Sequence, residues 1–200
     1  MKESLILVDE HDVVIGTAKK IDTHRKGLLH RAFSLFIYCA DKKMFLLQKR
    51  SIEKYHSGGK WSNSCCSHPY KNETWYESLQ RCVSDELNTE LVLSKKINCQ
   101  SNMSPQFIDE RLFFAGSFLY FSKYEELSEH EFDYVFIYTV DSNIPDVNFN
   151  SSEISEIKWL TLKEIDELLL KHKDKFTSWF PKAYSLAKKG ISYFDSIANE

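Results

Sequence analysis

The feature that most constrains the fold is one amphipathic helical segment set between two groups of strand-like segments. Residues 73–87 carry apolar side chains at i, i+3 and i+4 spacing, on Trp75, Tyr76, Leu79, Val83 and Leu87. This spacing predicts a helix with one buried face. On either side, β-branched and aromatic residues alternate with polar turns, which favours a sheet. Strands, a central helix, more strands and closing helices together predict an α+β domain with an α/β/α arrangement.

The expected strands lie in both halves of the chain. In the first half they are residues 5–8, 13–17, 32–39 and 44–48. In the second half they are residues 111–121, 132–140 and 156–160, and an acidic loop separates the first two. Residues 57–69 are rich in Gly, Ser, Asn, Cys, His and Pro without a clear period, which predicts a loop. Thr161 and Glu164 form a capping-box pattern at the start of a helical C-terminal segment.

Length and composition indicate one domain. A chain of 200 residues with 42% hydrophobic and 14% aromatic side chains can bury one sizeable core and has little reason to divide into two. The 26 basic and 29 acidic residues are interspersed and leave a formal charge of -3, so neither a broad basic face nor an acidic tail is present. We therefore expect a single domain over residues 1–200 and no nucleic-acid partner.

Cysteine usage and the N-terminal residues indicate the compartment. The five cysteines are Cys39, Cys65, Cys66, Cys82 and Cys99. Their odd number and irregular spacing favour free thiols in a reducing compartment. The first apolar run ends at Asp9 and is too short for a signal peptide or a membrane span. We expect a cytoplasmic protein with no membrane partner.

Histidines and a pair of glutamates are candidates for a metal site. His24 and His30 flank residues 25–29 just before an expected strand, and His68 lies in the expected loop. We expect His56, His130 and His172 to be structural or solvated. Glu129 and Glu131 flank His130 at the start of an expected strand. Because residues i and i+2 of a strand share a face, both carboxylates can point into one pocket. Three imidazoles and two carboxylates suit a divalent ion, although the spacing alone does not bring them together.

The adjacent thiols Cys65 and Cys66 allow two interpretations. In an extended segment only one of them can face a given site, and both can equally be small buried hydrophobic residues. A thiol near a cation has a lowered pKa and can exchange protons near neutral pH. Cys82 lies on the expected helix, where we expect it to pack.

The helix also matches a degenerate Nudix box. That box runs Gly, five residues, Glu, seven residues, then Arg-Glu-hydrophobic-x-Glu-Glu-x-Gly. The matching positions here are Ser67, Glu73, Arg81, Cys82, Val83, Asp85, Glu86 and Asn88. The spacing is kept, but both glycines and one central glutamate are replaced. On spacing alone, a surface ion pair between Arg81 and Asp85 is the simpler alternative.

Three motifs resemble the type I isopentenyl-diphosphate isomerases. They are residues 26–34 (KGLLHRAFS), 61–69 (WSNSCCSHP) and 129–134 (EHEFDY). They stand in the family's order with the degenerate helix between the second and third, and the resemblance covers roughly residues 4–182. It implies a Nudix-like α/β/α sandwich with a mixed sheet and flanking helices, and a motif-bearing core at about residues 30–165. It also implies an isomerase that interconverts isopentenyl and dimethylallyl diphosphate by protonation and deprotonation, feeding isoprenoid biosynthesis.

The resemblance further implies metal and catalytic residues. It implies one divalent ion bound by His24, His30, His68, Glu129 and Glu131. Manganese, zinc and iron all suit such ligands, and we expect Mn²⁺ or Zn²⁺. Cys66 matches the family's catalytic cysteine, and Glu131 matches its catalytic carboxylate as well as a metal ligand. Glu86 matches the residue that helps to hold Mg²⁺ on the diphosphate, with the Cys66 carbonyl nearby.

Substrate-binding residues are implied in the same way. Lys20, Arg50 and Lys54 fall where the family places cations that bind the diphosphate. Trp179 resembles the aromatic residue over the isoprenoid, where a ring stabilises a carbocation by about 0.5–2 kcal/mol. Tyr120 is the expected phenol partner of the catalytic carboxylate.

Two positions depart from the family pattern. Cys82 stands where the family commonly has an arginine that contacts phosphate, so a charge is missing unless Arg81 compensates. Asn88 replaces the glycine after the helix, and asparagine also tolerates a left-handed C-terminal cap.

Two other functions compete with the isomerase. A Nudix hydrolase that cleaves a diphosphate would need its full glutamate cluster to hold magnesium, but Cys82 occupies one of those positions. A catalytically silent Nudix-like binding module would have less use for Cys66, His68 and the glutamate pair together. For the isomerase we expect a small allylic or homoallylic diphosphate as partner and a monomer or homodimer.

Overall fold

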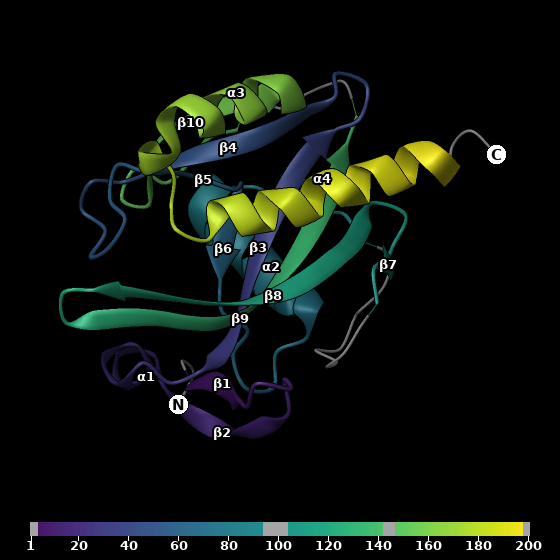
Figure 1. Cartoon of the computed structure of the whole chain (residues 1–200). Coiled ribbons are helices and arrows are strands. Elements are labelled where there is room, and N and C mark those ends of the chain that lie inside the picture. The colour runs from purple at the N-terminus through teal and green to yellow at the C-terminus, as the bar shows by residue number, and fades with distance from the viewer. Residues whose placement is uncertain (1–3, 94–103, 142–146, 198–200) are drawn as a thin grey trace.

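The computed structural model describes residues 4–93, 104–141 and 147–197 (Figure 1). Its strands are β1 (Ser4–Val8), β2 (Val14–Lys19), β3 (His30–Cys39), β4 (Met44–Arg50), β5 (Trp61–Ser62), β6 (Cys65–Ser67), β7 (Gln106–Phe107), β8 (Leu112–Tyr124), β9 (Leu127–Val140) and β10 (Ile154–Thr161). Its helices are α1 (Lys20–Lys26), α2 (Trp75–Leu87), α3 (Leu162–His172), the 3-10 turn η1 (Lys173–Lys175) and α4 (Phe180–Ile197).

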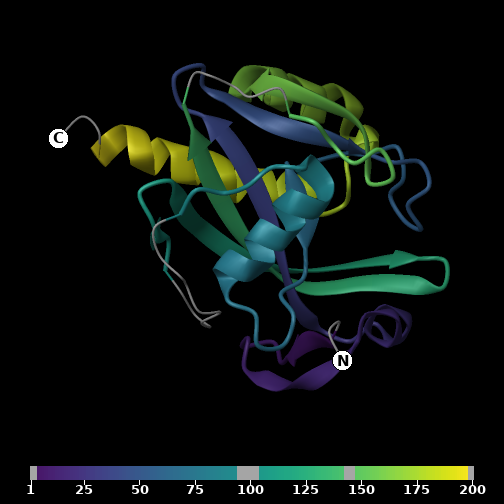
Figure 2. The ribbon, with the colours of Figure 1, turned by 180° about the vertical axis from the view of Figure 1, so that it is seen from behind.

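The strands form one mixed sheet. Its main order is β10-β4-β3-β9-β8-β7, with β1, β5 and β6 attached along β3 and β4 and β2 attached to β1. Strands β3 and β9 run parallel, and the other pairs are antiparallel. Helix α2 covers one face and α4 the other, as the two opposite views show (Figures 1 and 2). The predicted α+β class with an α/β/α sandwich is confirmed.

Each face of the sheet has its own core because side chains of a strand alternate between faces. Phe33 and Leu35 of β3 pack with Trp75 of α2 in one cluster. Phe36 of β3 packs with Phe180 of α4 in the other. All ten residues of β3 are buried, which fits a central strand covered on both sides.

The helix caps follow from local sequence. Thr74 accepts a hydrogen bond from the Glu77 backbone, and the Glu77 side chain accepts one from the Thr74 backbone, so α2 begins with a full capping box. The predicted helix 73–87 therefore starts at Trp75. Asn88 ends it in the left-handed conformation at φ 46°. The capping box predicted at Thr161 is also present at the start of α3.

The prediction of an acidic loop between the two long strands of the second half is wrong. Strands β8 and β9 continue as a hairpin, paired as far as Tyr124 opposite Leu127, and its end projects from the body of the sheet (Figure 1). Residues 122–131 include Glu125, Glu126, Glu129 and Glu131, which made the segment resemble an acidic loop. The expected loop 57–69 is also partly wrong, since it contains β5 and β6.

The N-terminal hairpin and α1 lie together at one end of the molecule (Figures 1 and 2). A buried polar contact fixes this part to the sheet. Arg31 on β3 donates from Nε to Asp12 Oδ1 at 2.7 Å and from Nη2 to the Asp12 carbonyl at 3.0 Å. The Tyr134 hydroxyl of β9 donates to Asp12 Oδ2. Asp12 ends the β1–β2 turn at φ 61°, a conformation that aspartate adopts more readily than most residues.

Two sequence-based expectations on thiols and membranes can be compared with the structure. Cys39, Cys65, Cys66 and Cys82 are free, as predicted, and Cys99 lies outside the described residues. None of the helices in the described part of the chain is long and apolar enough to cross a membrane.

Candidate active site

Strand register brings the predicted site residues onto one face of the sheet. His30 of β3 lies opposite Glu131 of the parallel strand β9. Ser34, four residues further along β3, lies opposite Cys66 of β6. Since i, i+2 and i+4 share a face and paired residues face the same side, the thiol and the carboxylate point to the same side. Tyr120 of β8 lies opposite Glu131 and joins them.

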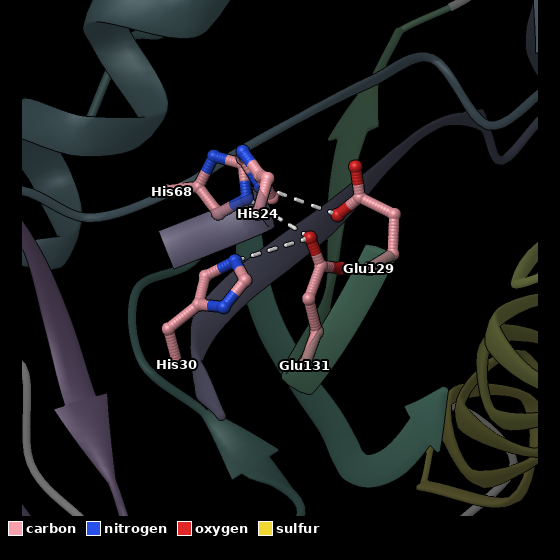
Figure 3. A group of neighbouring side chains, drawn as sticks. All are labelled: His24, His30, His68, Glu129 and Glu131. Atoms are coloured by element: carbon pink, nitrogen blue, oxygen red, sulfur yellow. Dashed lines mark hydrogen bonds and ion pairs between the residues drawn. The ribbon is translucent and has the colours of Figure 1, made fainter. Parts of the chain in front are cut away.

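Five side chains converge beside this face. His24, His30, His68, Glu129 and Glu131, here called the five-residue cluster, each offer one ligand atom, and these atoms lie within 4.8 Å of one another (Figure 3). Nε2 of His68 lies 2.9 Å from Oε1 of Glu131, and Nε2 of His30 lies 3.6 Å from the same oxygen. Nε2 of His24 lies 3.5 Å from Oε2 of Glu129. All five residues are buried.

The cluster fits a divalent metal ion. Nε2 of His24 and of His30 are buried and have no hydrogen-bond partner among the residues that the structure describes, which is costly for a polar atom unless a ligand meets it. Nδ1 of His30 donates to the Leu28 carbonyl at 2.8 Å. This bond leaves a lone pair on Nε2, directed at the cluster, the arrangement usual for metal-binding histidines. Mixed nitrogen and carboxylate donors suit divalent transition metals.

Glu131 is the most strongly held carboxylate of the site. Burial favours its neutral form, but the polar contacts of Glu129, His30 and Tyr120 outweigh burial and lower the pKa of Glu131 to about 2. Tyr120 donates to Oε2 at 2.5 Å. Burial and the neighbouring carboxylates raise the pKa of Tyr120 well above its ordinary value. The phenol therefore stays protonated and keeps donating to the carboxylate.

Cys66 lies beside a buried guanidinium. Burial raises the pKa of the Cys66 thiol well above its ordinary value, and Arg50 acts in the opposite direction. Nη1 of Arg50 donates to Cys66 Sγ at 3.9 Å, and the guanidinium lies over the Trp179 ring at 5.5 Å. Within the described residues Arg50 has no ion pair with a carboxylate, and its Nε has no partner. A buried positive charge without a carboxylate is typical of an anion site.

These groups line one cavity of about 430 Å³, here called the site cavity, a size usual for small-molecule sites. Its walls include all the predicted catalytic and substrate-binding residues, namely Lys20, Arg50, Lys54, Cys66, Tyr120, Glu131 and Trp179, together with Glu86, the predicted magnesium ligand. Lys54 is paired with Glu153. Trp179 is fixed by Nε1 donating to Asn63 Oδ1 at 3.1 Å. Of the five-residue cluster, His68, Glu129 and Glu131 line the cavity, and His24 and His30 do not.

Comparison with known proteins decides the family. A NUDIX domain matches residues 28–180. The chain is 41% identical over 189 residues to the isopentenyl-diphosphate Delta-isomerase of Aliivibrio fischeri (strain MJ11), covering 92% of this chain and 94% of that protein. It is 38% identical over 196 residues to isopentenyl-diphosphate Delta-isomerase 2 of Photorhabdus laumondii, covering 98% and 96%. The chain belongs to the isopentenyl-diphosphate Delta-isomerase family. The resemblance given by the three motifs is confirmed.

Solved structures confirm the Nudix fold of this isomerase family member. DR0079 from Deinococcus radiodurans superposes with a TM-score of 0.64 at 20% identity, covering 93% of this chain and 98% of that chain. The MutT protein from Methanosarcina mazei Go1 gives 0.56 at 19% identity, covering 80% and 94%. At these identities the likeness concerns the fold alone.

The degenerate Nudix helix of this family member does not carry the surface ion pair between Arg81 and Asp85. Arg81 pairs instead with Glu73, through Nε to Oε1 and Nη2 to Oε2, both at 2.9 Å. Nη2 also donates to the His68 carbonyl at 2.9 Å. Cys82 is buried in the core, as expected, and its Sγ lies 3.7 Å from Glu86 Oε1. Burial raises the pKa of Glu86, although Gln48 donates to it and opposes the shift.

His56 is the site residue that sequence reasoning missed. It was expected to be structural or solvated, but its side chain is 6% exposed and its Nε2 lies 2.7 Å from Glu129 Oε1. It also lines the site cavity. The two residues in contact are 73 positions apart, so no local sequence pattern predicts that they meet. The neighbouring Ser57-Gly58-Gly59 turn was the one signal in the sequence that the loop is tightly folded.

Proposed function

We propose that this protein interconverts isopentenyl diphosphate and dimethylallyl diphosphate. The observation that carries the proposal is the placement of the Cys66 thiol, the Glu131 carboxylate and the unpaired Arg50 guanidinium in one cavity. Such a cavity offers two proton-exchanging groups beside an anion site. The supporting comparison is the identity of 41% over nearly the whole chain to a protein named isopentenyl-diphosphate Delta-isomerase.

The reaction moves a double bond by one position. A proton is added to the terminal carbon of the unactivated alkene, and the positive charge develops on the tertiary carbon. Loss of a proton from the neighbouring methylene then gives the allylic isomer. Cys66 and Glu131 divide the donor and acceptor tasks, since each can hold or release a proton at the site cavity. Tyr120 donates to Glu131 and orients its carboxylate.

The remaining residues bind and shield the substrate. Arg50, Lys20 and Lys54 bind the diphosphate oxygens, a role that suits guanidinium and ammonium groups. Trp179 lies against Arg50 and Tyr120, with ring centroids 6.3 Å apart for Trp179 and Tyr120. Its ring excludes water from the cationic carbon and stabilises the charge by about 0.5–2 kcal/mol.

Two divalent ions belong to the proposal. The first is Mn²⁺ or Zn²⁺ held by the five-residue cluster, which when bound would fix Glu131 and tune its proton affinity. The second is Mg²⁺, which Glu86 would hold and which would offset the charge of the phosphate oxygens. Glu86 lines the site cavity, which supports this role. We further propose a cytoplasmic location and a monomeric or homodimeric enzyme.

The decisive experiment is incubation of the purified, metal-loaded protein with isopentenyl diphosphate and Mg²⁺ in heavy water. Proton NMR should show dimethylallyl diphosphate and deuterium incorporation. Cys66→Ala should abolish both, and the matched control Cys65→Ala should keep them, because Cys65 points into the α2 core. Phosphate release from a nucleotide panel without isomer formation would instead identify a Nudix hydrolase.

A further inference from the structure

His56 makes a direct contact with a member of the five-residue cluster from outside it. It lies on the loop between β4 and β5 and reaches Glu129 with Nε2 at 2.7 Å from Oε1. The other oxygen of that carboxylate, Oε2, faces Nε2 of His24 at 3.5 Å. The Glu129 carboxylate therefore lies between two imidazoles, one inside the cluster and one outside it.

The 2.7 Å contact brings Nε2 of His56 against a carboxylate oxygen, which can only act as the acceptor of a proton on that nitrogen. Among the described residues, the buried Nδ1 of the same ring has no hydrogen-bond partner. The polar contact that orients this ring is thus the one with Glu129. A donor to a ligand carboxylate from the next shell is the arrangement that fixes ligand orientation in metal sites.

Aromatic packing holds the His56 ring in place. The ring stacks on Tyr124 at a centroid distance of 4.8 Å and an angle of 24°. Trp179 approaches it edge-on at 6.1 Å. The Tyr124 hydroxyl contacts Ser57 Oγ at 3.2 Å and Ser178 Oγ at 2.9 Å. Three segments far apart in sequence therefore enclose this one side chain.

The loop that carries His56 is itself tightly closed. The Arg50 amide donates to the Lys60 carbonyl at 2.9 Å, and the Gly59 amide donates to the Arg50 carbonyl at 3.0 Å. A Cβ on Gly58 would lie 2.7 Å from the carbonyl oxygen of Ile52, so the loop needs glycine there to fold this closely. The imidazole is consequently held ready for Glu129 before any ligand binds.

We propose that His56 is a positioning residue that holds Glu129 in the orientation in which the five-residue cluster binds its metal. It acts through the ligand carboxylate and is not itself one of the five ligands. The inference rests on the proposed metal site but not on the isomerase reaction, so it is testable by metal binding alone.

Two variants separate the polar contact with Glu129 from the packing of the His56 ring. His56→Phe keeps an aromatic ring against Tyr124 and loses the donor. His56→Gln loses the ring and keeps an N–H donor that can reach Glu129. The matched control is His130→Phe, because His130 lies next to Glu129 on β9 but its Nδ1 contacts the Gly27 carbonyl at 2.9 Å instead of a carboxylate.

Each chelator-treated protein is titrated separately with Zn²⁺, against a chromophoric chelator, and with Mn²⁺, by electron paramagnetic resonance of the free ion. No diphosphate is present. We expect His56→Phe to raise the Kd of at least one of these metals about 10- to 100-fold, as for other outer-shell partners. We expect His56→Gln and His130→Phe to bind close to wild type.

Other outcomes overturn the inference. They are wild-type affinity in His56→Phe, equal weakening in His56→Gln, which would assign the effect to packing, and equal weakening in His130→Phe, which would assign it to general loosening. Failure of wild type to bind either metal would remove the metal site and this inference with it. Isomer formation by the same wild-type sample is measured by NMR and judges the proposed function separately.

Discussion

Replacing Arg31 by leucine should destabilise the whole protein through a buried charge. Asp12 is fully buried and Arg31 is 3% exposed. Without the guanidinium, the Asp12 carboxylate keeps only the Tyr134 hydroxyl as a side-chain partner among the contacts described above. Removing one partner of a buried ion pair costs about 3–5 kcal/mol. For a chain of this length the melting temperature should fall by roughly 6–20 °C.

A second substitution isolates the charge from the lost packing. In Asp12→Asn/Arg31→Leu both charges are gone, while asparagine can accept from Tyr134 and tolerates φ 61°. The double variant should therefore recover most of the lost stability, since replacing both partners of a buried pair is often nearly neutral. Both variants lose the same packing of the arginine side chain. The difference in stability between them therefore measures the cost of a buried carboxylate without its charged partner.

Scanning calorimetry at pH 7 on the three proteins tests this reasoning. A single variant that melts within about 2 °C of wild type would show that the pair contributes little. A double variant as unstable as the single one would show that packing, and not the charge, is responsible. Because the N-terminal hairpin leads into α1 and His24, we also expect the single variant to bind metal more weakly than the double one.

Three further predictions concern the site and its supports. Tyr120→Phe removes a hydrogen bond to the charged Glu131, worth about 1.5–3 kcal/mol, so kcat should fall about 10- to 150-fold with KM little changed in the NMR assay; an unchanged kcat would contradict it. Gly58→Ala places a Cβ 2.7 Å from a backbone oxygen and should lower stability by about 1–3 kcal/mol in urea unfolding while weakening activity, and wild-type behaviour would mean that the loop yields easily. Burial opposes the shift, but hydrogen bonds, chiefly with Arg81, lower the pKa of Glu73 below 4.5. Its stabilising effect is therefore complete above the unfolded-state pKa and is lost as pH falls through the folded-state pKa. Glu73→Gln should accordingly unfold at lower urea concentration than wild type at pH 7 and approach wild type as the pH falls through the folded-state pKa of Glu73. A difference that persists in acid would point to packing.

Much of the fold could be predicted because its signals are local. The α2 helix is predicted by its apolar spacing, and β3 is predicted by its run of apolar residues. The two-residue alternation of a strand predicts that Glu129 and Glu131 share one face. The meeting of these carboxylates with three histidines did not follow from spacing, and only the family resemblance grouped them.

The rest could not be predicted because it depends on contacts between distant residues. Helix α1 has the sequence KIDTHRK, which carries no apolar stripe, and it was not expected. Residues 122–131 of the β8–β9 hairpin carry mostly polar and charged side chains, so apolar alternation does not mark them as strand, although Glu129 and Glu131 are buried. The role of His56 depends on the folded loop that brings its side chain against Glu129, which the sequence alone does not show.

The site combines the Nudix core with a part that lies outside it. The NUDIX match begins at residue 28, whereas Lys20 and His24 come from α1. His24 thus completes a cluster whose other four members belong to the core, and the Asp12–Arg31 contact is what fixes the preceding hairpin to β3 and β9. A Nudix core alone would leave His30, His68, Glu129 and Glu131 open on this side. The added N-terminal part therefore supplies the fifth ligand, His24, and brings the cation Lys20 to the site cavity. This gives a physical reason for the buried Asp12–Arg31 contact that attaches it.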